Sequence, residues 1–293
     1  MADLPAVTPP LRGETVLNPD GTVTQKFAEY LEKVFEATEN LNKDFYFEVQ
    51  RGNVPGYSIV HKFGRNAAVA NGSFELVSLL SGATSFLSAA TTVRVKAGNT
   101  NDTAAGTGAQ AITVVGIDTT LAEVSESIAT AGTSASSASS ASFWRVYRAY
   151  VTAASAGTYG GANTAAVTIE NSGGGTDLIQ IAAGEGQSQY AAYTIPTGHT
   201  AYVLSTQITV DGNKAADVKL CRRAGFNDVS TPFEPTRIMR YWDGVLGVVN
   251  FKPVTPMPAL AALTDVWFEA SGSGAITEVS ADFELMLVQD GFS

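Results

Sequence analysis

Histidine and cysteine, the side chains that most often act as bases, nucleophiles and metal ligands, are scarce in this chain. Its 293 residues include two histidines, His61 and His199, and one cysteine, Cys221. A Ser–His–acid triad would have to use one of those histidines. His199 lies in a turn-like segment, so we expect it at the surface. His61 lies in an alternating segment, and we expect it to face solvent or a subunit contact. We expect Cys221 to be a small buried apolar side chain, and we predict no catalytic residue and no cofactor.

Three stretches resemble ligand-binding loops in composition alone. Residues 106–108 and 173–175 are glycine-rich, but no lysine follows either of them, and strands follow in place of the helix of a phosphate loop. Asn99, Asn101 and Asp102 could offer oxygens to Ca²⁺. The glutamate of an EF-hand loop is missing there, and an Asx-rich turn explains the pattern equally well. We predict turns and no metal site.

Tyrosines on predicted strands could form a platform for sugar rings. They are Tyr147, Tyr150, Tyr159, Tyr190, Tyr193 and Tyr202. Aromatic side chains on strands are more often core residues or members of cross-strand pairs. Glycoside hydrolysis needs two carboxylates held close together, and the sequence does not show which of the 28 acidic residues would form such a pair. A glycan-binding module and a polysaccharide-degrading enzyme therefore stay open as alternatives to the predicted non-enzymatic role.

The composition favours a protein whose surface is covered by neighbours. Charged residues make up 16% of the chain, against roughly 25% in typical soluble domains, and Ala, Ser, Thr and Gly take their place. A net charge of −10 leaves little to gain from neutralising phosphates, so no nucleic-acid partner is expected. The first residues lack the features of a signal peptide, and no apolar run approaches the length of a membrane span, so no membrane partner is expected.

Residues 1–44 are predicted to form an anchoring arm and an oligomerisation helix. Pro5, Pro9 and Pro10 keep the arm extended, and Thr22 with Gln25 reads as a capping box that opens the helix. The apolar stripe of the helix consists of Phe27, Tyr30, Leu31, Val34 and Leu41, with Thr38 on the same seam. Phe27, Leu31, Val34, Thr38 and Leu41 follow one another at alternating spacings of four and three, which are those of a heptad, and Tyr30 and Phe35 widen this apolar face. Because an isolated helix of this length is marginal in water, the stripe must pack on the body or on other copies, and we expect a homotrimer.

From Phe45 onward the period changes to two, which predicts short antiparallel strands. They include 45–50, 52–64, 74–80, 91–97, 111–117, 121–129, 143–152 and further segments to the end of the chain. In 143–152, Phe143, Arg145, Tyr147 and Ala149 share one face, and Trp144, Val146, Arg148 and Tyr150 share the other. The Ala/Ser-rich segment 131–142 is predicted to be a loop or edge within the β-body.

Turn signals at intervals of about 8–12 residues are typical of sandwiches and jelly rolls. We therefore predict a mainly β protein, an antiparallel β-sandwich with jelly-roll character that carries an N-terminal arm and one amphipathic helix. The expected domains are 1–44, a β-sandwich over 45–182, and a second β-unit over 183–293 that can be continuous with the first.

Two sets of short motifs resemble proteins of tailed-phage virions. The pattern Asn18-x-Asp20-Gly21-x-x-Thr24-x-x-Phe27-x-x-Tyr30-Leu31 resembles the arm and trimer-forming helix of some tail and fibre proteins. The segments 51–66, 101–118 and 189–203 resemble a family of phage virion structural proteins through K-F-G-x-N, D-T-A-x-G-T-G-A and Y-T-I-P-x-G-x-T-A-Y. None of these is a catalytic motif.

The resemblance implies a non-enzymatic virion structural protein that is assembled in the host cytoplasm with other tail, collar or capsid proteins. The leading expectation is a homotrimeric tail or collar fibre, or a fibre adaptor, anchored by the N-terminal arm. The alternatives are a capsid cement or decoration protein and a receptor-binding module that recognises a host surface glycan.

Overall fold

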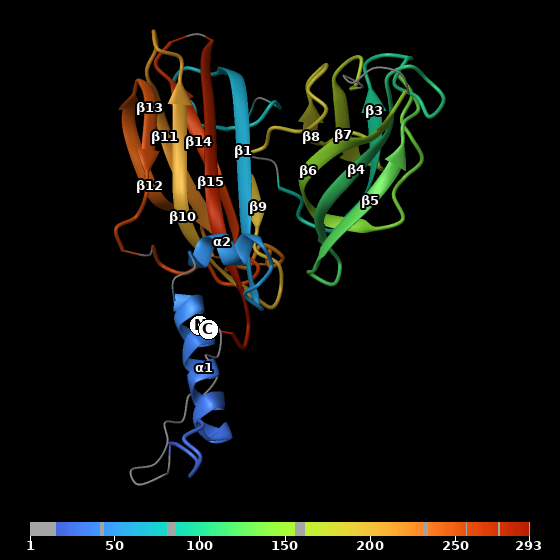
Figure 1. Cartoon of the computed structure of the whole chain (residues 1–293). Helices are drawn as coiled ribbons and strands as arrows, with labels where there is room; N and C mark the ends of the chain where they lie inside the picture. The colour runs from blue at the N-terminus through green and yellow to red at the C-terminus, as the bar shows by residue number, and fades with distance from the viewer. Residues whose placement is uncertain are drawn as a thin grey trace. The chain divides into compact units, whose positions relative to one another are not determined.

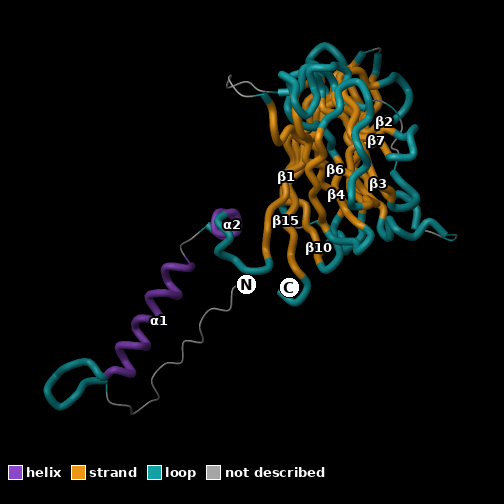
Figure 2. Tube along the Cα trace, turned by 90° about the vertical axis from the view of Figure 1, so that its right-hand side faces the viewer, coloured by secondary structure: helices purple, strands orange, loops and turns teal. Residues whose placement is uncertain are grey.

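A computed structural model describes residues 16–41, 44–80, 82, 86–155, 162–230, 232, 234–255, 257–274 and 276–292, without the side chains of 35–41. The chain forms two compact units, residues 1–59 with 287–293 and residues 60–286. The predicted mainly β architecture with antiparallel sheets is confirmed (Figures 1 and 2). In chain order the elements are α1 (Gln25–Leu41), α2 (Phe45–Gln50), β1 (Tyr57–Val69), β2 (Glu75–Leu76), β3 (Thr91–Ala97), β4 (Ala109–Asp118), β5 (Glu123–Ala129), β6 (Ser142–Ala154), β7 (Val167–Asn171), β8 (Asp177–Ile181), β9 (Ala192–Thr194), β10 (His199–Val210), β11 (Ala216–Arg223), β12 (Arg237–Val245), β13 (Gly247–Phe251), β14 (Asp265–Gly272) and β15 (Thr277–Gln289).

Two sheets have the strand order of a jelly roll. One sheet runs β1-β15-β10-β13, and the other runs β12-β11-β14-β2, with β9 also paired to β14. If β1, β2 and β10–β15 are lettered B to I in chain order, the sheets read B-I-D-G and F-E-H-C, which is the eight-stranded jelly-roll arrangement. Aromatic rings join the sheets: Phe268 of β14 lies 6.0 Å from Phe283 of β15, and both are fully buried. The expected jelly-roll character is therefore present in the topology.

The remaining strands form a third sheet that is inserted between β2 and β9. Its order is β5-β4-β6-β3-β7-β8, with antiparallel pairings throughout. The expected boundary at residue 183 lies just after its last strand, and the division into folding units at that point stays a prediction. The sheets group β1 and β2 with β9–β15, because β2 pairs with β14 and β1 with β15.

The serine-rich segment lies within the inserted sheet, as predicted. The backbone N–H of Ser136 donates to the Val95 carbonyl, and the Ser136 hydroxyl accepts from the Val95 N–H at 2.9 Å. Ser139 makes the same two bonds with Val93. The serine hydroxyl oxygens thus replace the carbonyl oxygens that a regular strand would offer to β3. In this way a segment that is not a strand provides hydrogen-bond acceptors for the buried N–H groups of β3.

Two local predictions are wrong for identifiable reasons, and a third is only partly right. Residues 45–50 form helix α2 and not a strand, because the Asp44 carboxylate accepts from the Phe47 N–H at 3.1 Å and caps a helical turn. Thr22 does not open α1, because its N–H and hydroxyl both donate to Asp20 inside a tight turn. The helix instead begins at Gln25, and the Thr24 carbonyl accepts from the Ala28 N–H. The strand expected over 74–80 is limited to β2.

Candidate assembly interface

Helix α1 presents the predicted apolar stripe without burying it. Phe27, Tyr30 and Val34 are half-buried, and Leu31 is 36% exposed. The rings of Phe27 and Tyr30 stack with their centroids 5.9 Å apart. These four members of the predicted interface lie together on one helix with apolar surface in contact with solvent. Pro5, Pro9, Pro10 and the side chain of Leu41 lie outside the described residues.

The turn before α1 adds to this exposed surface. Leu17 and Val23 form an antiparallel bridge, which the Asn18 N–H closes by donating to the Thr22 carbonyl at 2.7 Å. Leu17 is 49% exposed and Val23 is 46% exposed. Apolar side chains therefore precede the helix as well as lie along it.

Helix α2 carries three further exposed rings in the same unit of the chain. They belong to Phe45, Tyr46 and Phe47, and Phe47 is 61% exposed. The helix is fixed from its other side, since the Glu48 carboxylate accepts from Arg51 at 3.2 Å and from Asn53. Exposed aromatic clusters of this kind are typical of interfaces between proteins.

The C-terminal residues of this unit hold the start of β1 in place. The Tyr57 hydroxyl donates to the Phe292 carbonyl at 2.8 Å, and the Gln289 N–H donates to the Gly56 carbonyl at 2.7 Å. A side chain at Gly56, where φ is +76°, would collide with the Phe292 ring. The segment that follows α2 is thus fixed by backbone and ring contacts.

In the other unit, edge strand β12 is largely exposed. Ile238 is 55% exposed and Tyr241 is 45% exposed, although β12 pairs with β11 along one side. An exposed apolar edge strand readily pairs with another chain unless charges protect it, and Arg237 and Arg240 lie on this one. Apolar and charged side chains are therefore exposed together on this strand.

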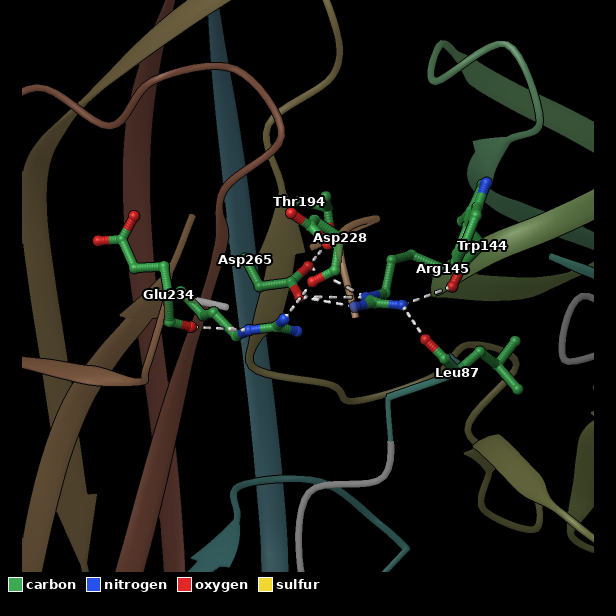
Figure 3. Close-up of polar contacts among 8 residues, drawn as sticks. Leu87, Trp144, Arg145, Thr194, Asp228, Glu234 and Asp265 are labelled. Atoms are coloured by element: carbon green, nitrogen blue, oxygen red, sulfur yellow. Dashed lines mark hydrogen bonds and ion pairs between the residues drawn. The ribbon is translucent and has the colours of Figure 1, made fainter. Parts of the chain in front are cut away.

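A buried ion pair connects the inserted sheet with the jelly roll (Figure 3). The Arg145 guanidinium of β6 donates to both carboxylate oxygens of Asp265 of β14 at 2.9–3.2 Å, and the Thr194 hydroxyl donates to the same carboxylate at 2.6 Å. Arg145 also donates to the carbonyls of Leu87 and Trp144 at 2.8 Å. Its guanidinium lies between the rings of Phe86 and Phe226, 4.7 Å from each centroid.

The sequence pattern puts Arg145 on a strand face with three apolar side chains, but it does not identify the partner of this arginine. That alternation is confirmed, since Phe143, Arg145, Tyr147 and Ala149 are all buried while Arg148 and Tyr150 are exposed. An arginine on a buried strand face needs an anion. The position of Arg145 among apolar side chains could therefore have predicted a buried ion pair. Asp265 lies 120 positions further along the chain, at a distance that no local pattern bridges.

A second buried cation, Lys62, lies beside the same strand. Its ammonium donates to the Tyr147 carbonyl and lies 5.1 Å from the centroid of the Tyr147 ring. Burial, together with the nearby Arg148, lowers the pKa of Lys62 to about 7, and the opposing attraction comes from Glu123. Glu123 accepts from the hydroxyl of Tyr147, and burial raises the pKa of that tyrosine above its usual range.

The residues considered for catalysis have structural or surface positions. His61 is exposed, and His199 begins β10 with its Nδ1 3.0 Å from the Thr197 carbonyl. Cys221 is buried as predicted, and burial, assisted by Glu269, raises the pKa of its thiol to about 12, so the reactive thiolate is suppressed.

The Asx-rich stretch is organised as a turn. Asp102 is fully buried, and its carboxylate accepts from the backbone N–H groups of Ala109, Thr164 and Ala165 at 2.7–3.0 Å. Across the described residues, no group of three or more His, Cys, Asp and Glu side chains is arranged to hold a metal ion. Within the same part of the chain, no helix combines the length and apolar character that crossing a membrane requires.

Comparison of the chain with known proteins gives one weak structural similarity and no sequence relative. No family model matches the chain, and no curated protein matches it. Among solved structures, a chain in the structure of infectious bursal disease virus Gx strain aligns with 85% of this chain and 79% of its own length, at 8% sequence identity and a TM-score of 0.22. The chain therefore has a weak structural neighbour from a virus, and a TM-score this low carries no argument about function.

Proposed function

We propose that this protein is a non-enzymatic structural component of a virus particle that oligomerises through α1. The observation that carries the proposal is the half-exposed stripe of Phe27, Tyr30, Leu31 and Val34 on a 17-residue helix. A helix of this length gains most of its stability from packing of its apolar face. A second copy of the same stripe supplies that packing, and the heptad spacing fits such self-association.

Two further observations support a role in assembly. Apolar and aromatic side chains are exposed at the turn before α1 and on α2, which places several contact surfaces in one unit of the chain. Jelly-roll domains occur in viral capsids, lectins and cupins. The topology therefore agrees with a virion role and with other functions of jelly-roll domains. The support for a role in assembly comes from the exposed apolar side chains.

The proposed molecule is a homotrimer that serves as a tail or collar fibre, or a fibre adaptor, with its N-terminal segment as the anchor. The phage-like motifs around Asn18–Leu31 motivate this form. A capsid decoration protein would use the same surfaces. It would be present in hundreds of copies per particle, whereas a fibre component would be present in a few dozen at most, so gel densitometry of purified particles separates the two.

The test measures the oligomeric state of the full chain by sedimentation equilibrium. We expect the wild type to be trimeric and the double substitution Phe27→Asp with Leu31→Asp to be monomeric, because two carboxylates on the seam cannot be buried unpaired. Lys33→Asp, on the exposed side of the same helix, is the matched control and leaves the trimer intact. A wild-type chain that stays monomeric would overturn the proposal.

A further inference from the structure

An open pocket of about 440 Å³ lies on β6 of the inserted sheet. Its lining consists of Arg148 and Tyr150 from the strand and of Glu185, Gly186 and Gln187 from the loop between β8 and β9. Pockets that hold small ligands commonly have volumes of about 300–1,000 Å³. We propose that this pocket binds a saccharide unit that carries a carboxylate. The proposal is independent of the assembly role.

Backbone hydrogen bonds fix the walls of the pocket. The Val151 N–H donates to the Gly186 carbonyl at 2.8 Å, and the Ser188 N–H donates to the Ala149 carbonyl at 2.8 Å. These bonds place Gln187 directly opposite Tyr150 in an antiparallel bridge. Since alternate residues of a strand point to the same side, Arg148 and Tyr150 lie on one face. The backbone that carries these side chains is held in position before any ligand arrives, which lowers the entropy lost on binding.

Arg148 is the group that selects an anion. Most described arginines are occupied by carboxylates, carbonyls or rings, namely Arg51, Arg65, Arg94, Arg145, Arg223, Arg237 and Arg240. Within the described part of the chain, the side chains of Arg148 and Arg222 make no hydrogen bond, ion pair or ring contact. A guanidinium on a rigid strand offers a fork of donors that matches a carboxylate.

Nearby charges strengthen this preference. The buried Lys62 ammonium lies close enough to Arg148 for the two cations to repel each other. Glu185, the one acidic group in the lining, accepts from the Gln189 side chain at 3.2 Å and is attracted to Arg65. An anion bound by Arg148 would therefore relieve repulsion between cations.

The other lining groups suit a sugar ring better than a peptide. Tyr150 is 36% exposed, while Tyr147, Tyr190 and Tyr193 are buried, so it is the residue of the predicted tyrosine platform that combines exposure with a place in the pocket. Its ring can cover the C–H face of a sugar, and the Gln187 amide can donate to and accept from hydroxyls. Peptide grooves rely on apolar side-chain pockets or an open strand edge. This lining has no aliphatic side chain, and residues 186–188 are already paired with β6.

The test is isothermal titration calorimetry of the full-length protein with trigalacturonate. We expect saturable binding, weakened at least about 10-fold by Arg148→Gln, which removes the ionic contact. Tyr150→Ala should weaken it about 5-fold or more, because a stacking surface is lost. Arg222→Gln removes the other unpartnered arginine and is the matched control, with unchanged affinity expected. Thermal melting by circular dichroism confirms that each variant is folded.

Two further ligands make the outcome decisive. The neutral maltotriose should bind at least about 10-fold more weakly, because it cannot use the guanidinium. Triglutamate carries the same number of side-chain carboxylates without sugar rings. If it binds as tightly as trigalacturonate, the saccharide assignment is wrong. No saturable binding of trigalacturonate, or equal loss in Arg148→Gln and Arg222→Gln, would overturn the site itself.

Discussion

Arg145 and Asp265, 120 positions apart, form a bidentate ion pair in which both side chains are at most 4% exposed. The pair connects β6 of the inserted sheet to β14 of the jelly roll, and Thr194 and two backbone carbonyls satisfy its remaining polar atoms. Charges buried at this depth persist only when they are paired and hydrogen-bonded.

Removal of the charge of Asp265 should therefore be costly. We expect Asp265→Asn to lower the free energy of unfolding by about 3–5 kcal/mol, because it leaves the Arg145 guanidinium buried without an anion. Urea denaturation followed by tryptophan fluorescence measures the change. The double variant Arg145→Met with Asp265→Leu should recover most of the loss. A double variant no more stable than Asp265→Asn would show that packing, and not the unpaired charge, is the cause.

The serines that face β3 should be distinguishable from their neighbours. We expect Ser136→Ala and Ser139→Ala each to destabilise the chain by about 1–3 kcal/mol, because each leaves a buried N–H of β3 without its acceptor. Ser137→Ala changes an exposed side chain in the same run of small residues and should have little effect. Differential scanning calorimetry compares the melting temperatures of the three variants. Equal melting temperatures would contradict the assigned hydrogen bonds.

Lys62 should make stability depend on pH. Its pKa is about 7 in the folded chain and near the ordinary value of 10.5 in the unfolded chain, so between these values the unfolded chain binds more protons. The free energy of unfolding should therefore rise with pH, by up to about 1.4 kcal/mol per unit, from about pH 7 toward 10. Below about pH 7 both states are protonated, and the cost of burying the charge is constant.

Lys62→Met isolates this contribution. Its stability relative to the wild type should be greatest near about pH 6 and should shrink by about pH 9, where the wild-type lysine is neutral when folded. Urea denaturation at the two pH values gives the comparison. Parallel pH profiles for the two proteins would mean that Lys62 stays charged or reaches solvent in the folded state.

Gly64, in the K-F-G-x-N segment, should not tolerate a side chain. A Cβ there would lie 2.2 Å from the Ala191 nitrogen and the Val77 oxygen, which are themselves joined by a 3.0 Å backbone hydrogen bond. We expect Gly64→Ala to cost at least about 1–3 kcal/mol, since rigid backbone must move. Gly212→Ala is the control, because nothing lies within 4 Å of a Cβ at that position. Equal thermal stability of the two variants would contradict this packing.

Much of the fold could be read from the sequence because period and turn chemistry are local. The alternation over 143–152 gave the correct division of side chains between two faces, and the turn residues gave the short-strand pattern of a jelly roll. The phage-like motifs also have structural explanations. Asp102 ties its own loop to Ala109, and Thr194 donates to Asp265. The residues of these motifs make structural hydrogen bonds, so the motifs by themselves do not indicate a function.

What could not be read depends on contacts between distant residues. The alternating apolar pattern of 45–50 fits a strand, and a single cap at Asp44 was enough to make it helical. The pairing of β1 with β15 and the insertion of a separate sheet between β2 and β9 depend on which strands pair with each other. Hydrophobic periodicity does not predict strand pairing. In the same way, the pocket beside Arg148 depends on a loop more than 30 positions further along the chain.

The strand order also constrains how the molecule can be made. β1 pairs with β15, which lies far along the chain, so the first jelly-roll strand has no strand partner in its sheet until β15 has been synthesised. The six-stranded segment in between has all its partners much sooner. Contacts this far apart in sequence slow folding and leave strand edges exposed meanwhile. The inserted sheet should therefore become protease-resistant on the ribosome first, and a nascent chain stalled before β15 should need chaperones to stay soluble.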